Sequence, residues 1–214
     1  MYEQFLQHLT TTAHQDRNFV EWHGGIKHYG FWAIIIQNRP WENLFNAASD
    51  HIQGLTLKGY RRQPHITISS SGLLDPKHFS KEQFEQQYEA LIQADIAAFT
   101  LTANSLNSFA GSPYISIDDQ QGGLSAIRRV LHSIIEEDSP ATEYTPHITL
   151  GLYDEAFNCP LVVECLERFE PRSVADLYVD KIAFCSYETD SIQGPLVVID
   201  SVRLTPNHGM QTGQ

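Results

Sequence analysis

The segment Pro64-His65-Ile66-Thr67 occurs a second time at Pro146-His147-Ile148-Thr149, and this duplication indicates a fold with an internal repeat. Each copy continues into a segment with the pattern of a strand. Because successive side chains of a strand point to opposite faces, the histidine and threonine of each copy share one face. The isoleucine between them points the other way, into a core. Each copy therefore presents an imidazole beside a hydroxyl.

The segments around the two copies recur in the same order and spacing. In each half, a predicted strand and a predicted helix precede the copy. The distance from Ile36, at the end of the first strand, to His65 is 29 positions, and the distance from Ile117 to His147 is 30. This repeat predicts two lobes related by approximate two-fold symmetry, which would bring both copies to one cleft.

Hydrophobic periodicity predicts the remaining elements. A capping box at residues 80–83 predicts the start of one helix. We expect an N-terminal extension at 1–30, lobes at roughly 31–110 and 111–205, and a flexible polar tail at 206–214. The other expected elements are strands within 31–36, 99–102, 114–117, 177–186 and 195–204, and helices within 41–53, 124–135 and 161–169.

Composition and cysteine usage indicate the class of protein and its location. The 214 residues are 42% hydrophobic and 19% charged, which is typical of a globular chain. No apolar run approaches the roughly 20 residues of a membrane-spanning helix, and the N-terminus lacks the pattern of a secretory signal. Three cysteines without a close pair fit free thiols. We therefore expect a cytoplasmic monomer that does not bind membranes.

The formal net charge of −12 limits the kind of nucleic-acid partner. A long, sequence-independent grip on RNA or DNA needs many Lys and Arg contacts to phosphates, so no extended nucleic-acid track is expected. A nucleotide or one RNA end remains compatible, because local charge decides its binding. Lys58, Arg61 and Arg62 precede His65, whereas Glu136-Glu137-Asp138 lies ahead of the second copy. The positive charge of a shared cleft would come mainly from the first half.

The duplicated motif resembles the signature of the two-histidine (2H) phosphoesterase superfamily, which includes bacterial 2′-5′ RNA ligase-like proteins and cyclic nucleotide phosphodiesterases. That signature is two H-x-[ST]-hydrophobic motifs in two symmetric lobes, and His65-Ile66-Thr67-Ile68 and His147-Ile148-Thr149-Leu150 both match it. The element order matches from about 31 to 204, whereas residues 1–30 match no shared pattern. Repeat and resemblance together predict an α+β fold of two pseudo-symmetric lobes. Antiparallel sheets would form a central cleft, with helices packed outside.

The residue types in the two motifs suit hydrolysis of a strained 2′,3′-cyclic phosphate. This reaction needs a base to deprotonate water and an acid to protonate the leaving ribose oxygen, and imidazole can serve as either near neutral pH. His65 and His147 are the candidate catalytic residues, although the sequence does not assign their roles. Thr67 and Thr149 would donate hydrogen bonds to the phosphate oxygens. We expect no metal or other cofactor.

Further residues are candidates to contact the substrate. If the segment before His65 is extended, Arg61 shares its face and Arg62 does not. Tyrosines could stack on a base, and an aromatic side chain could line the pocket. The candidates for these contacts are Arg61, Tyr60, Tyr144, Tyr187 and Trp32. His23 and His28 could suggest a metal site, but their spacing across two glycines places no two ligands well.

The sequence thus predicts a metal-independent phosphodiesterase that acts on a 2′,3′-cyclic phosphate or a 2′-5′ linkage of a nucleotide or RNA end. Two alternatives stay open. A non-catalytic module could hold a nucleotide or phosphate in the same cleft without turnover. A metal hydrolase could use some of the 10 histidines, and its activity would then be lost in a chelator.

Overall fold

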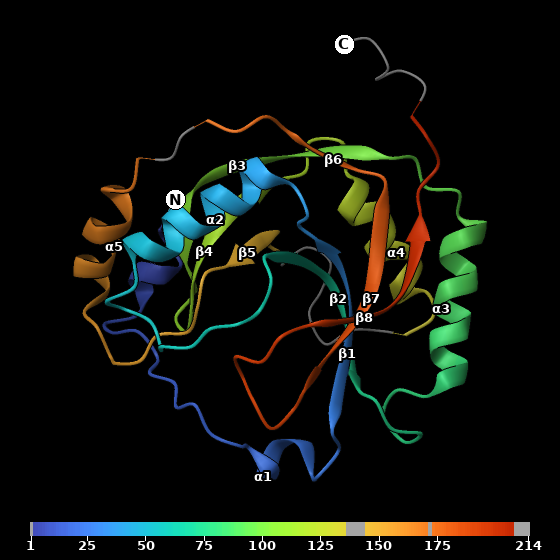
Figure 1. The fold of residues 1–214 in the computed structure, drawn as a ribbon, viewed down its shortest axis with the longest axis horizontal. Helices are drawn as coiled ribbons and strands as arrows, with labels where there is room; N and C mark the ends of the chain where they lie inside the picture. The colour runs from blue at the N-terminus through green and yellow to red at the C-terminus, as the bar shows by residue number, and fades with distance from the viewer. Residues whose placement is uncertain (1, 136–143, 171–172, 208–214) are drawn as a thin grey trace.

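The computed structural model describes residues 2–135, 144–170 and 173–207, which form two four-stranded sheets with helices around them (Figure 1). Every strand pair is antiparallel. The predicted α+β class with antiparallel sheets is therefore confirmed. The first sheet has the order β2-β1-β7-β8 and the second has the order β5-β4-β3-β6. The strands are β1 (His28–Ile35), β2 (His65–Leu73), β3 (Phe99–Ser108), β4 (Pro113–Asp118), β5 (His147–Thr149), β6 (Leu177–Val179), β7 (Lys181–Glu188) and β8 (Val197–Arg203).

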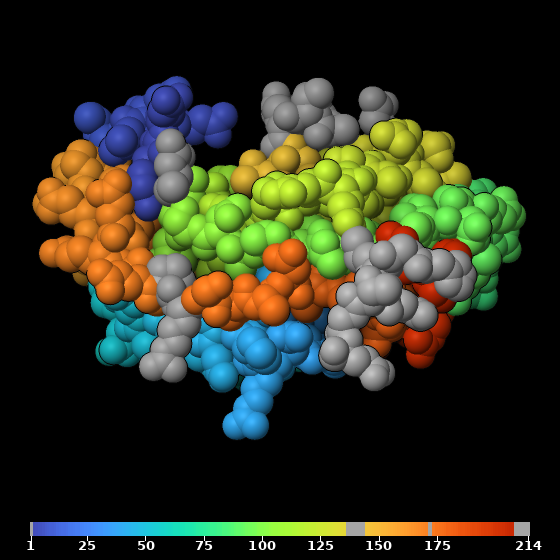
Figure 2. Space-filling view, turned by 90° about the horizontal axis from the view of Figure 1, so that it is seen from above, coloured from blue at the N-terminus to red at the C-terminus, as the bar shows by residue number. Residues whose placement is uncertain are grey.

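Each sheet takes strands from both halves of the chain. The late strands β7 and β8 complete the first sheet, whereas the early strand β3 lies in the second. The boundary expected between residues 110 and 111 therefore does not separate the strands of one sheet from those of the other. From above, the segment that leads into β6 crosses the molecule between α2 and β3 (Figure 2). The Trp41 indole of α2 donates to the carbonyl of Ala175 in this segment at 2.9 Å.

The helices begin where side chains cap them. α3 (Lys81–Gln93) starts at the predicted capping box, in which Ser80 and Gln83 exchange hydrogen bonds with each other's backbone. α2 (Arg39–His51) starts two residues before the expected position because the Asn38 side chain accepts from the Trp41 amide. The other helices are α4 (Gly123–His132), α5 (Cys159–Glu167), the short α1 (Val20–His23) and the 3-10 turn η1 (Phe5–Gln7).

The N-terminal segment, expected to lie outside the repeat, contributes to the core. Phe5 is buried in η1, and the buried Tyr2 donates its hydroxyl to the Leu106 carbonyl of β3 at 2.9 Å. Most of the polar tail predicted at 206–214 lies outside the described residues, as do the acidic residues at 136–138. In the described part of the chain, no helix is long and apolar enough to cross a membrane.

The first sheet carries buried apolar side chains on both faces, and one of these faces also carries His65. Trp32 and Ile34 on one face of β1 join the main core. Phe31 and Ala33 on the other face form a smaller buried cluster with residues of β7. Alternation along the strand explains this division. The smaller cluster lies on the face that carries the side chain of His65, since the Phe31 ring centroid is 5.8 Å from that of His65.

Candidate active site

The first motif lies on β2, which is the edge strand of the first sheet. His65 is paired with Ile35 of β1, and Thr67 is paired with Ala33. Ile66 between them is fully buried in the main core. The alternation of the strand thus directs the imidazole and the hydroxyl away from that core, toward the face of the smaller cluster.

The second motif occupies the corresponding place in the second sheet. β5 is again an edge strand, with His147 paired with Ser116 of β4 and Thr149 paired with Tyr114. Ile148 is 1% exposed and belongs to the main core. Both motifs therefore sit on edge strands, at corresponding places in the two sheets.

Each imidazole is oriented by the carbonyl two residues before it. His65 Nδ1 lies 2.8 Å from the Gln63 oxygen, and His147 Nδ1 lies 2.7 Å from the Thr145 oxygen. Because a carbonyl oxygen only accepts, Nδ1 carries the proton in both rings. This tautomer leaves Nε2 of each neutral imidazole as the nitrogen that can exchange a proton with a ligand.

Burial controls the proton affinity of His65. Its side chain is 7% exposed and lies against Phe31. Burial lowers the pKa of His65 to about 4, against the raising effect of its hydrogen bond to Gln63, and the positive charges of Arg62 and His147 lower it further. His65 is therefore neutral at physiological pH.

His147 also lies among aromatic rings, but its side chain is less buried than that of His65. Its ring centroid is 4.9 Å from that of Phe109 and 5.2 Å from that of Tyr114. Burial lowers the pKa of His147, and the hydrogen bond to Thr145 opposes this shift. Its side chain is only half-buried. Of the two imidazoles, His147 is thus the one with more access to solvent.

Two interactions connect the segments of the two motifs. The charge of His147 contributes to the lowered pKa of His65, so the two rings are within electrostatic reach of each other. The Tyr144 hydroxyl, three residues before His147, donates to the Thr67 carbonyl at 2.8 Å. The guanidinium of Arg128 lies over the Tyr144 ring, 4.1 Å from its centroid. The segment that leads into the second motif is thereby bonded to β2, the strand of the first motif.

Of the two arginines before His65, Arg62 is the one whose charge acts on His65, while Arg61 is exposed. Arg61 would share the face of His65 if the segment before it continued the strand, but residues 61–64 precede β2 and form neither a strand nor a helix. The Arg62 guanidinium lies 4.0 Å from the centroid of the Tyr187 ring. Tyr187 is half-buried at the edge of the smaller cluster.

Trp32 was predicted as a possible substrate contact, and its position in the structure contradicts this prediction. Its side chain is 0% exposed, and its indole donates to Gln87 at 2.9 Å within the main core. It occupies the face of β1 opposite Phe31, so it cannot touch a ligand at His65. Tyr60 and Tyr144 are partly buried against the same core. Burial raises the pKa of Tyr60 to about 12.

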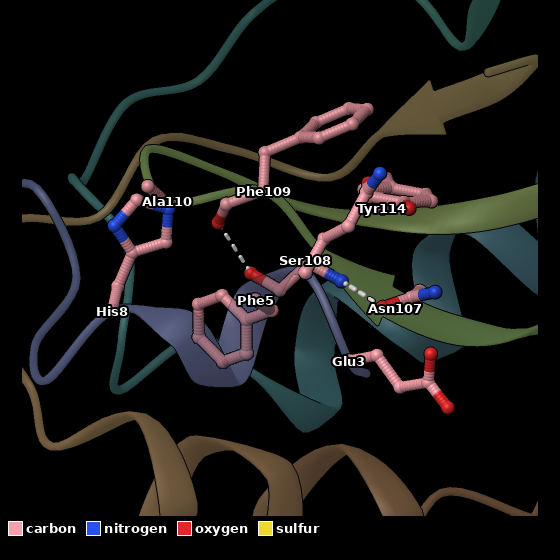
Figure 3. Close-up of a pocket in the computed structure, with 9 residues that line it drawn as sticks. Glu3, Phe5, His8, Asn107, Ser108, Phe109, Ala110 and Tyr114 are labelled. Atoms are coloured by element: carbon pink, nitrogen blue, oxygen red, sulfur yellow. Dashed lines mark hydrogen bonds between the residues drawn. The ribbon is translucent and has the colours of Figure 1, made fainter. Parts of the chain in front are cut away.

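The rings around the two imidazoles were not identified from the sequence. Phe31 could have been found from its alternation with Trp32 along β1. Phe109 and Tyr114 depend on the register between β3, β4 and β5, which no local pattern reveals. These two rings also line a pocket of about 410 Å³ that η1 closes on its other side (Figure 3).

The histidines considered for a metal site have other surroundings. His23 Nε2 lies 2.7 Å from Asn18 Oδ1, and His23 Nδ1 accepts from the Gly25 amide at 3.1 Å. His28 is exposed at the start of β1. Within the ranges that the structure describes, no three His, Cys, Asp or Glu side chains form a metal-binding group. All three cysteines are free thiols.

Comparisons with known proteins identify similar sequences and folds. The family model of the 2′-5′ RNA ligase superfamily matches residues 40–191. Escherichia coli LigT, in its complex with 3′-AMP, is 17% identical with a TM-score of 0.59, over 85% of this chain and 99% of LigT. The Thermus thermophilus protein TT0787 is 14% identical with a TM-score of 0.59, over 84% and 100% of the two chains. No curated protein sequence matches the chain. At these identities the structures establish a shared fold.

Proposed function

The chain belongs to the 2′-5′ RNA ligase superfamily, and from this premise we propose that it is a metal-independent phosphodiesterase. Its substrate would be a 2′,3′-cyclic phosphate or a 2′-5′ linkage of a nucleotide or an RNA end. Solved LigT structures contain 3′-AMP, NADP+ or ATP, and these ligands support a nucleotide as the substrate class. The free cysteines fit a reducing compartment, so we propose that the protein acts in the cytoplasm.

One observation supports this function above the others. Two imidazoles within electrostatic reach of each other are held in the same tautomer by equivalent carbonyl contacts, to Gln63 and to Thr145. A packing role for the histidines would not require the same orientation twice. Proton transfer at two sides of one phosphorus does require it, because each Nε2 must face the reacting group.

The pKa shifts and exposures assign different roles to the two histidines. His65 is buried and neutral, so its Nε2 is the base that removes a proton from the attacking water. His147 is more exposed, and in its protonated form it is the acid that donates Nε2–H to the leaving oxygen. As the water oxygen bonds to phosphorus, the bond from phosphorus to the ribose 3′ oxygen breaks. The product carries a 2′-phosphate, with one proton gained by His65 and one lost by His147.

Three further side chains would stabilise the negative charge of the transition state. The hydroxyls of Thr67 and Thr149 share the faces of their histidines and would donate to the non-bridging oxygens. The positive charge of Arg62 acts on the same site, as its effect on the pKa of His65 indicates. Together these groups provide two donors and one fixed cation.

Turnover of a 2′,3′-cyclic mononucleotide in excess EDTA tests the proposal. Wild-type protein should hydrolyse it, and His65→Asn should abolish the reaction while retaining the fold. Binding of the nucleotide without turnover would instead support the non-catalytic module. Loss of activity in EDTA with rescue by zinc or manganese would show that a metal performs the chemistry.

A further inference from the structure

The side chain of Gln63 connects the segment before His65 to the segment before β8. Its Nε2 donates to the Leu196 carbonyl at 3.1 Å, and its Oε1 accepts from the Leu196 amide at 2.8 Å. One side chain thus makes both hydrogen bonds that a residue of an antiparallel strand would exchange with Leu196. We call these two bonds the Gln63–Leu196 pair. Because the Gln63 carbonyl also accepts from His65 Nδ1, the pair is one residue's backbone away from the imidazole.

Leu196 also belongs to the packing beside His65. Its side chain is 6% exposed and lies in the smaller buried cluster together with Phe31. The Phe31 ring is in turn the one that lies against His65, at a centroid distance of 5.8 Å. Leu196 is therefore tied to the surroundings of His65 twice, by its backbone through Gln63 and by its side chain through the cluster.

Other hydrogen bonds hold the loop between β7 and β8, residues 189–196, farther from the imidazole. The Arg61 amide donates to the Gln193 carbonyl at 3.0 Å. Gln193 is 1% exposed, and its Nε2 donates to the Lys58 carbonyl at 3.2 Å and to the Asp16 carboxylate at 2.9 Å. These bonds hold the loop at residues 58 and 61, whereas the Gln63–Leu196 pair holds it two residues before His65.

We propose that Gln63 is a positioning residue for His65: by bonding Leu196 to the segment before β2, it keeps the imidazole packed against Phe31 and keeps its Nδ1–H directed at the Gln63 carbonyl. This inference rests on the proposed function, in which the neutral His65 is the base. The amide of Gln63 is engaged with Leu196, so it acts through His65 and not on the substrate.

Loosening the Gln63–Leu196 pair should change the protonation of His65 in a definite direction. Burial is the largest cause of its lowered pKa, and the hydrogen bond to the Gln63 carbonyl opposes this shift. Entry of water should therefore outweigh a weakened bond to Gln63 and raise the pKa of His65 toward the usual value of about 6.5.

The groups that surround His65 are unchanged by a substitution of Gln63. Arg62 of the preceding segment and His147 of β5 both lower the pKa of His65 through their charges. Phe31 of β1 covers the ring, and Tyr187 of β7 follows at a centroid distance of 5.9 Å from Phe31. Because none of these groups is replaced, a raised pKa of His65 in a Gln63 variant would report the entry of water.

The competing explanation is that Pro64 alone sets the Gln63 carbonyl. A residue before proline is restricted to extended conformations, whatever its side chain does. Thr145 precedes Pro146 in the same way, and its carbonyl orients His147. On this explanation the side chain of Gln63 is dispensable for His65, and its substitution should leave the imidazole unchanged.

The test follows the imidazole by NMR of protein labelled with 15N histidine, with His65→Asn identifying the signals. In wild type, His65 should stay neutral and carry its proton on Nδ1 from pH 8 down to about pH 5. Gln63→Ala should raise its pKa by about one unit or more and reduce the population with Nδ1–H. Gln63→Met keeps the length of the side chain without its amide and should behave like Gln63→Ala. Gln93→Ala is the matched control, because Gln93 is exposed at the end of α3.

Kinetics on a 2′,3′-cyclic mononucleotide connect the spectra to the reaction. In Gln63→Ala the acid limb of kcat/KM should move to higher pH together with the pKa of His65, and kcat should fall by roughly 3-fold or more with little change in KM. An unchanged pKa and tautomer in both folded variants would overturn the positioning role, as would altered spectra with wild-type kinetics. Loss of folding in both variants would also overturn it, since Gln63 would then serve the fold. If wild-type protein turns over no substrate, the proposed function fails, and the spectra still decide whether Gln63 positions the ring.

Discussion

The Tyr144 hydroxyl donates to the Thr67 carbonyl at 2.8 Å, so the segment before the second motif is bonded to the strand of the first. The Arg128 guanidinium lies over the Tyr144 ring. The two motifs lie in different sheets that share the main core, and this hydrogen bond is a direct link between their segments. In the proposed mechanism, such contacts would help to set the distance between His65 and His147, to which catalysis would be sensitive.

Tyr144→Phe should lower activity more than it lowers stability. Removing the hydroxyl costs about 1 kcal/mol in the free energy of unfolding, the usual contribution of one hydrogen bond. Because the phenyl ring remains beneath Arg128, the fold should persist while the motifs lose their alignment. We expect kcat to fall by roughly 10-fold or more. Chemical denaturation and steady-state kinetics on a cyclic mononucleotide measure both effects, and an unchanged kcat would contradict the alignment role.

Thr67→Ala and Thr149→Ala should each reduce kcat/KM by roughly 100-fold, the typical loss of one hydrogen-bond donor to a transition state. Thr→Ser keeps the hydroxyl at each position and is the matched control, with a much milder loss expected. Circular dichroism would confirm that the strands persist. Equal impairment of the serine and alanine variants would mean that the hydroxyl is not the group that acts.

The pH profile of kcat/KM should be a bell displaced toward acid. His65 must be neutral to act as a base, so activity should rise as pH increases through its pKa of about 4. His147 must be protonated to act as an acid, so activity should fall as pH passes its pKa, which burial holds below the usual value of about 6.5. The maximum should lie between these limits. A profile that keeps rising to alkaline pH would show that the reaction needs no protonated histidine, and would contradict the pairing of one acid with one base.

The same burial of His65 makes stability depend on pH. In the folded chain His65 stays neutral down to about pH 4, whereas in the unfolded chain it binds a proton near its ordinary pKa of about 6.5. Protons therefore favour the unfolded state in this window, and the free energy of unfolding should decrease as pH falls through it. His65→Gln should flatten this slope in urea titrations at pH 4.5 and 6.5. An identical slope in the variant would show that other groups cause the dependence.

Local patterns predicted most of the elements, and long-range pairing accounts for what they missed. The capping box at Ser80 located α3, and alternation around His65 placed Ile66 in the core, because both features depend on neighbours in sequence. The exchange of β3 and β7 between sheets depends on pairing between distant segments. The same holds for the contact of Phe109 with His147. The preference for Arg61 over Arg62 depended on an extended segment before His65, and residues 61–64 form neither a strand nor a helix.

The resemblance drawn from the two motifs is confirmed by the family match, which covers residues 40–191 and therefore includes both histidines. The N-terminal segment stayed unexplained because it carries no shared pattern. In the structure it supplies Phe5 to the core, and its Trp22 ring contacts the Tyr29 ring. Neither contact follows from the periodicity of a segment so short.

We propose that His65 and His147 act on one phosphorus, and a double-mutant comparison measures whether the two histidines act together. We would measure kcat/KM on a 2′,3′-cyclic mononucleotide for His65→Ala, His147→Ala and the double variant, with folding confirmed for each. Each single change should remove most of the activity, and the double change should add far less than the product of the two losses, because groups that act as a unit are non-additive. Full activity in either folded single variant, or losses that multiply in the double variant, would contradict the account.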